Sequence, residues 1–120
     1  MNKSTDYKDL IVWQKAIDLA TWTYNLTAIF PREEIYGIVS QMRRAAVSVP
    51  SNIAEGQSRQ YKTEFIQFLS IAKGSLAELE TQLIISNRLK YINENDINDG
   101  KNRIAEINRL LHSLVAKLKG

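Results

Sequence analysis

At 120 residues the chain has the usual length of one domain, and its 44% hydrophobic and 24% charged residues are the proportions of a folded globular protein, not of a disordered one. No apolar run approaches the ~20 residues of a membrane-spanning helix, and the first ten residues, MNKSTDYKDL, lack the apolar core of a secretory signal. We therefore expect a cytoplasmic protein without membrane contact. Cysteine is absent, which excludes disulfides, thiolate metal sites and cysteine nucleophiles.

The formal net charge of +3 is unevenly distributed along the chain. Residues 41–62 carry four bases against one acid, residues 101–120 carry five against one, and residues 78–99 carry two against five. This segregation allows a basic face for an acidic partner.

The first predicted element is a helix over about residues 8–29, because apolar or small residues recur there at steps of three and four. It ends before Pro31, since proline disfavours helix for the residue that precedes it. The positions expected to face the core are Leu10, Trp13, Ile17, Ala20, Tyr24 and Thr27.

A second helix is predicted over about residues 33–57, and Glu33 and Glu34 in its first turn suit the positive end of the helix dipole. Pro50 lies inside this pattern, where it removes one backbone hydrogen bond and crowds the carbonyl of Ala46. Either the helix kinks there or two separate helices meet; the kink is favoured because the stripe continues to Ile53. The inward positions are Ile35, Val39, Met42, Ala46, Val49, Ile53 and Gly56.

The third and fourth helices are predicted over about residues 61–90 and 95–119. Because the connections between all four helices are short, consecutive helices must lie antiparallel, which gives an all-α, up-down-up-down four-helix bundle in a single domain. The third helix has the clearest stripe, with Phe65, Leu69, Ala72, Leu76, Leu79, Leu83 and Ser86; the fourth has Ile97, Ile104, Ile107, Leu111, Leu114 and Leu118.

Apolar residues also lie outside these stripes. The first helix adds Ile11, Trp22 and Leu26, and the third helix has two further apolar flanks, which are harder to hide inside four helices. One account is a wide core with scattered surface residues. The account we favour is self-association. The flanks consist of Ile66, Ala77 and Ile84 on one side and Ile71, Ile85 and Leu89 on the other.

The residues of known bundle catalysts are missing. A carboxylate-bridged di-metal site takes two Glu-x-x-His motifs, whereas this chain has one histidine, His112, and no such motif. A nucleophilic triad lacks its Gly-x-Ser-x-Gly elbow, and no glycine-rich phosphate loop is present. We therefore predict neither an enzyme nor a bound cofactor or metal.

A row of polar residues runs along the second predicted helix, where Arg44, Ser48, Ser51 and Glu55 share the side opposite Met42. This row is a solvated face, a contact between subunits in which Arg44 or Glu55 meets a charged partner on a neighbour, or a nucleic-acid contact. For nucleic acid the candidate residues would neutralise phosphates without reading sequence. They are Arg43, Arg44, Arg59, Lys62, Lys101, Arg103, Arg109, Lys117 and Lys119.

Four segments carry a family resemblance: LIVWQKA at residues 10–16, FPREEIYG at 30–37, QMRRAAVSVPSNIAEG at 41–56 and EFIQFLSIAKGSLAELE at 64–80. In this order they resemble the four-helix-bundle proteins of the 23S ribosomal RNA intervening-sequence family, which are bacterial. Relatives of that family include the accessory variability protein of diversity-generating retroelements, a basic pentameric ring that binds nucleic acid and a reverse transcriptase. The resemblance therefore implies a homopentamer, a nucleic-acid role and a protein partner such as a reverse transcriptase.

Together these observations lead to two hypotheses. The first is a non-enzymatic, oligomeric bundle that binds RNA or DNA through backbone phosphates as an adaptor for another protein. The alternative is a structural or protein-interaction scaffold that binds no nucleic acid. The apolar flanks of the third helix, with Arg44 and Glu55, are the candidate oligomer interface in both.

Overall fold

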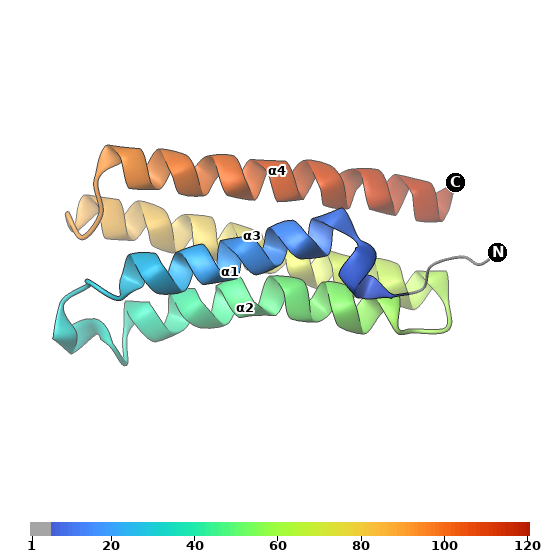
Figure 1. The fold of residues 1–120 in the computed structure, drawn as a ribbon, viewed down its shortest axis with the longest axis horizontal. Coiled ribbons are helices and arrows are strands. Elements are labelled where there is room, and N and C mark those ends of the chain that lie inside the picture. Colours follow the sequence, from blue (N-terminus) through green and yellow to red (C-terminus); the bar gives the residue numbers. More distant parts are fainter. Residues whose placement is uncertain (1–5) are drawn as a thin grey trace.

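The computed structural model describes residues 6–120, and within them the chain forms four long α-helices and no strand. Figure 1 shows successive helices running in opposite directions along an elongated bundle. The predicted all-α, antiparallel four-helix bundle is confirmed. The helices are α1 (Ile11–Thr27), α2 (Ile38–Gln57), α3 (Lys62–Arg88) and α4 (Glu94–Lys119), and the 3-10 helices η1 (Tyr7–Asp9) and η2 (Arg32–Glu34) precede α1 and α2.

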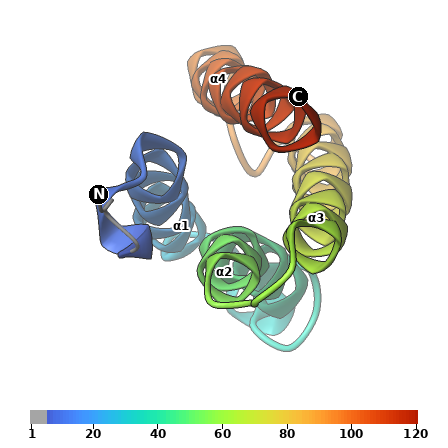
Figure 2. The same ribbon diagram turned by 90° about the vertical axis from the view of Figure 1, so that its right-hand side faces the viewer.

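The four helices surround one core. Viewed from the end, α2 lies between α1 and α3, and α4 lies beside α3 (Figure 2). The α2–α3 pair is joined by a hydrogen bond from Ser75 to Ser48. The Ser86 hydroxyl, which donates to the Gln82 carbonyl at 2.8 Å, also lies 3.5 Å from the Met42 sulfur, and both contacts show the antiparallel register of the two helices. Large side chains without exposed surface fill the centre, among them Leu19, Met42, Leu76, Leu83 and Leu111.

The first helix is shorter than the predicted span of 8–29. The backbone of Leu10 is extended, with φ −75° and ψ 126°, so η1 ends there and α1 starts only at Ile11. The ring of Tyr7 in η1 packs edge-on against Trp13, with 5.4 Å between the ring centroids. At the other end α1 stops at Thr27, before Phe30 and Pro31.

The predicted inward stripe of the first helix is wrong in part. Ile17 and Tyr24 are exposed, and only Thr27 of the predicted positions is fully buried. The other buried residues of the helix are Val12, Ala16, Leu19 and Thr23. Two threonines can be buried because their hydroxyls donate 2.8 Å hydrogen bonds to the carbonyls of Leu19 and Thr23, one turn earlier.

The second helix begins five residues later than predicted, at Ile38 instead of residue 33. Residues 32–34 form η2, and Gly37 has a non-helical backbone with φ −110° and ψ −118°. Ile35 consequently lies outside the helix and is half exposed, while the other predicted inward positions are buried. The helix continues through the buried Pro50 to Gln57, so the alternative of two separate helices is wrong.

The third and fourth helices agree with their predictions to within two residues at each end. All seven predicted inward positions of α3 are buried. Between the helices Lys90 has φ 66°, the left-handed conformation that commonly ends a helix. Asn93 then caps α4, accepting a 2.8 Å hydrogen bond from the backbone N–H of Asp96, whose carboxylate accepts one from Asn93 in return.

Candidate assembly and phosphate-binding surfaces

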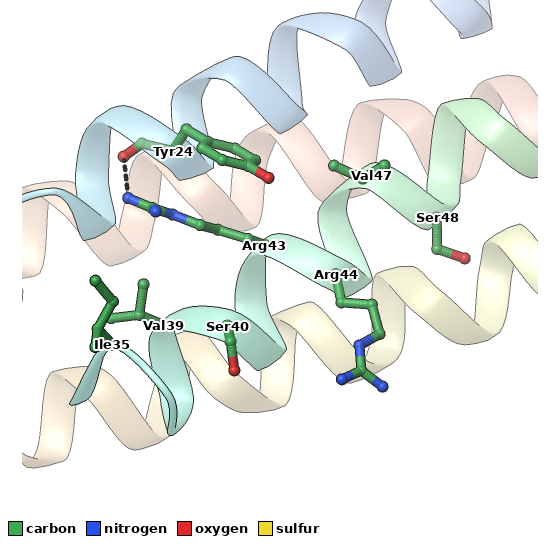
Figure 3. Close-up of a pocket in the computed structure, with 8 residues that line it drawn as sticks. All are labelled: Tyr24, Ile35, Val39, Ser40, Arg43, Arg44, Val47 and Ser48. Carbon is green, nitrogen blue, oxygen red and sulfur yellow. Dashed lines mark hydrogen bonds between the residues drawn. The ribbon is translucent and has the colours of Figure 1, made fainter.

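A shallow groove of about 550 Å³ follows the outer face of α2 (Figure 3). The exposed side chains of Tyr24, Ile35 and Val47 make it largely apolar. We call this surface the α2 groove; it is lined by Tyr24, Ile35, Val39, Ser40, Arg43, Arg44, Val47 and Ser48.

The two arginines of the α2 groove differ in what they bind. The guanidinium of Arg43 extends to α1, where it donates to the Thr27 hydroxyl at 2.9 Å and to the Tyr24 carbonyl at 3.3 Å and lies 4.5 Å from the Tyr24 ring centroid. Arg44 points away from Tyr24 (Figure 3) and has no hydrogen bond or ion pair with residues 6–120. Of these two arginines, only Arg44 therefore has all the hydrogen-bond donors of its guanidinium available for a partner.

Two members of the polar row on α2 make contacts within the chain. The Ser75 hydroxyl of α3 donates to the Ser48 hydroxyl at 2.9 Å, and the Glu55 carboxylate accepts a 2.9 Å charged hydrogen bond from Arg59. The Arg59 guanidinium also lies 4.8 Å from the Phe68 ring centroid. Of the two charged residues that the sequence places in a subunit contact, Glu55 is thus engaged and Arg44 is free.

The two apolar flanks of α3 lie on different sides of the helix. The flank of Ile66, Ala77 and Ile84 is turned toward α4: Ile66 shares a small groove with Val115, Ala77 shares one with Asn108, and Ile84 packs against the core. The flank of Ile71, Ile85 and Leu89 remains uncovered, with exposed fractions of 52%, 44% and 51%.

Glu78 completes this uncovered flank. Ile71, Glu78 and Ile85 are spaced by seven residues, which places them in one line along the helix, and Leu89 follows one turn later. Glu78 is exposed and has no ion pair within residues 6–120. We call these four residues the α3 strip.

The nine candidate nucleic-acid bases do not form one patch. Arg43 and Arg59 are engaged as described, and Arg103 donates to Asp99 at 3.0 Å with its guanidinium over Trp22. Lys117 lies beside Leu10 and Ile11, on the α1 side of α4. The bases that have no partner within residues 6–120 are Arg44, Lys62, Lys101, Arg109, Lys117 and Lys119.

A second groove, of about 650 Å³, lies between α3 and α4, and of its charged residues only Arg109 is among the nine nucleic-acid candidates. Four groups with charge or potential charge meet there without any ion pair between them: Lys73, Glu80, Arg109 and His112. The usable signal was the spacing, since Lys73, Ala77 and Glu80 share one side of α3, and Arg109 and His112 lie one turn apart on α4. We call this surface the α3–α4 groove; its other lining residues are Ala77, Asn108 and Ser113.

A polar contact joins the two loops at one end of the bundle. The Tyr91 hydroxyl donates a 2.7 Å hydrogen bond to the Glu34 carboxylate, and the Tyr91 ring packs against Phe30. This hydrogen bond, with desolvation and the negative charges of Glu34 and Glu33, raises the pKa of Tyr91 above its usual value. The contact ties η2 to the α3–α4 connection.

Two features are absent from residues 6–120. No three histidine, aspartate or glutamate side chains gather closely enough to hold a metal ion. None of the helices in this range is both long and apolar enough to cross a membrane.

Comparison with known proteins places the chain in a family. A crystal structure of a protein of unknown function from Bacteroides thetaiotaomicron, described as a member of the S23 ribosomal protein family, is similar with a TM-score of 0.78 and 27% sequence identity, over 88% of this chain and 98% of that one. No curated protein sequence matches the chain. Residues 8–113 match the family described as 23S rRNA-intervening sequence protein, and the chain belongs to that family.

Proposed function

We propose that the protein is a non-enzymatic module that assembles with copies of itself through the outer faces of α2 and α3. The α3 strip carries this proposal. Three large aliphatic side chains, each about half exposed, line one side of a helix whose opposite side is fully buried. A row of this kind exposes apolar surface to water at a cost that a partner surface removes.

The α2 groove supports the same function. Among residues 6–120, six of the eleven large apolar side chains that remain exposed belong to the α2 groove or the α3 strip. The apolar surface is thus concentrated on neighbouring faces of the bundle, as in interfaces between subunits. The family resemblance favours five copies.

Variants of the α3 strip test this function. Replacing Ile71 and Ile85 together by serine removes most of the exposed apolar surface of the α3 strip and leaves the core unchanged. We therefore expect at least a tenfold weaker assembly, measured by sedimentation velocity over a concentration series. The matched control is Ile17→Ser, because Ile17 is exposed on α1 outside both surfaces. Equal assembly of the double variant and the control would contradict the proposal.

A second candidate function, binding of RNA or DNA, is favoured by the α3–α4 groove. Lys73 and Arg109 face its space without neutralising partners and outnumber the single acid, Glu80. On α4, Lys101, His112 and Lys119 are spaced by 11 and 7 residues, which aligns them on the side of this groove. Bases arranged in this way neutralise backbone phosphates and read no sequence.

Titration with fluorescently labelled single-stranded RNA and DNA of mixed sequence tests this second function. We expect binding at 50 mM salt that weakens steeply at 200 mM salt, and a loss of about tenfold or more for Lys73→Glu combined with Arg109→Glu. The charge-matched control is Lys8→Glu combined with Arg32→Glu, outside the groove. If neither RNA nor DNA binds at low salt, this second function is wrong, and the alternative of a scaffold that binds no nucleic acid stands.

A further inference from the structure

We propose that neighbouring copies are joined by two different surfaces: the α3 strip of one copy lies in the α2 groove of the next, with Glu78 of the first beside Arg44 of the second. This inference rests on the proposed self-assembly and specifies its geometry. The occupant of the α2 groove is therefore a second copy of this chain.

The charges of the two surfaces are complementary. The α2 groove contains two bases and no acid, and Arg44 is the one without a partner in residues 6–120. The α3 strip contains one charged residue, Glu78, which has no ion pair in the same range. A contact of groove with groove would bring unpaired bases together, and a contact of strip with strip would bring unpaired acids together, both of which are unfavourable.

Glu55 is the rival partner for Arg44, because both lie in the polar row of α2. Its carboxylate, however, already accepts a 2.9 Å hydrogen bond from Arg59, and Arg59 is held in place over the Phe68 ring. A contact between Arg44 and Glu55 of a neighbour would have to share or break this pair. Glu78 makes no such contact and lies among the aliphatic residues that need covering.

The register of α2 and α3 brings the two surfaces to the same height along the bundle. The contacts of Ser75 with Ser48 and of Ser86 with Met42 place Glu78 within about one helical turn, ~5 Å, of the level of Arg44. By the same register Ile85 and Leu89 lie at the level of the groove end formed by Ile35 and Val39. A neighbour related by rotation about an axis parallel to the bundle, without a shift, therefore presents Glu78, Ile85 and Leu89 to the α2 groove, and Ile71 lies beyond Ser48 at the end of the groove.

The positions of the surfaces indicate a closed ring. Figure 2 shows α1 and α3 on either side of α2, so the helices that carry the α2 groove and the α3 strip are neighbours in the bundle. Head-to-tail contacts between two such surfaces turn each copy relative to the last, and without a shift along the axis the series forms a ring when that rotation divides a full turn.

Charge reversal tests the pairing. Arg44→Glu and Glu78→Lys each place like charges in the contact, so we expect each variant alone to assemble at least tenfold more weakly than the unmodified protein, as measured by sedimentation velocity. The double variant restores opposite charges at every contact and should assemble as the unmodified protein does. Mixing the two single variants in equal amounts restores opposite charges wherever unlike variants meet, so the mixture should assemble more strongly than either variant alone. Glu55→Lys is the control for the rival partner and should assemble normally. Circular dichroism checks that each variant is folded.

The outcomes separate the pairing from the function on which it rests. If the unmodified protein assembles but the double variant stays dissociated, or if the single variants assemble normally, the contact between Glu78 and Arg44 is wrong while self-assembly stands. If the unmodified protein is a monomer at every concentration, self-assembly is wrong and the pairing falls with it.

Discussion

The two flanks of α3 contain the same kinds of side chain and differ in what covers them. Ile84 packs against the core on the side of α4, whereas the next residue, Ile85, is 44% exposed on the other side. Hydrophobicity alone therefore does not distinguish a core position from a docking position on this helix. The position of the neighbouring helix decides, because α4 covers one flank and no element within residues 6–120 covers the other.

The adjacent pair Ile84 and Ile85 offers the strongest contrast between the flanks. Ile84→Ala should lower the free energy of unfolding by about 2 kcal/mol, because it removes packed methyl groups, while Ile85→Ala should change it by less than about 0.5 kcal/mol. The measurement is urea unfolding followed by tryptophan fluorescence. Both changes are made in the Arg44→Glu background, so that assembly does not contribute to stability. Equal losses of unfolding free energy for the two variants would mean that Ile84 and Ile85 are packed to the same extent, which contradicts the difference between the flanks.

Two glycines extend the contrast between covered and uncovered positions. A Cβ on Gly56 would lie 2.8 Å from the Phe68 Cβ and from a ring carbon of Phe65, whereas a Cβ on Gly74 would meet nothing within 4 Å. Gly56→Ala should therefore lower the free energy of unfolding by about 1–2 kcal/mol through overpacking. Gly74→Ala should raise it by about 0.5–1 kcal/mol, because alanine is the better helix former. Opposite signs in the same urea experiment confirm the contrast, and stabilisation by both changes would contradict it.

Gln82 lies at the buried edge of α3 and has an unsatisfied acceptor. Its side-chain oxygen is buried without a hydrogen-bond partner among residues 6–120, and only 6% of the residue is exposed. Gln82→Met keeps the length of the side chain and removes the unpaired carbonyl, so we expect about 1 kcal/mol of added stability. Thr81→Met on the exposed side of the same helix is the control. A loss of stability in Gln82→Met would contradict this account, because it would show that the Gln82 side chain makes a stabilising contact.

Tyr91 allows a pH test of the contact between the two loops. Its folded pKa is raised above the usual value of about 10 by the hydrogen bond to Glu34, so its stabilising contribution is complete below that value and is lost as pH rises through the folded pKa. Absorbance titration should show a late tyrosine ionisation step above the usual tyrosine pKa, and Tyr91→Phe should remove this step. If the late step persists in Tyr91→Phe, the assignment is wrong.

The sequence predicted α3 and α4 well because each has one dominant stripe and clear ends, as the capping residues Asn93 and Asp96 illustrate. It failed on α1, where two stripes one position apart fit the same spacing. Leu19 and Thr23 face the core, and Ile17 and Tyr24 do not. Threonine can occupy a core position because its hydroxyl donates a hydrogen bond to a carbonyl of the preceding turn, and a hydrophobicity pattern does not show such hydrogen bonds.

The candidate surfaces were predictable only in part. The spacing of Ile71, Ile85 and Leu89 identified an apolar flank on α3, but the same reasoning applied to Ile66 and Ile84, which α4 partly covers. Lys73 and His112 come together because α3 and α4 are antiparallel neighbours, and a linear count of charge does not reveal such a pairing. The sequence does not distinguish Arg43 and Arg59 from Arg44, because the contacts of Arg43 with Tyr24 and of Arg59 with Phe68 depend on the tertiary structure.

The molar mass of the unmodified protein in solution tests the central claim, that the uncovered flank of α3 is a contact between copies. Light scattering coupled to size-exclusion chromatography measures it over a range of micromolar concentrations. The account predicts a mass that is a multiple of the 13.7 kDa of one chain. A mass of one chain throughout that range would contradict it.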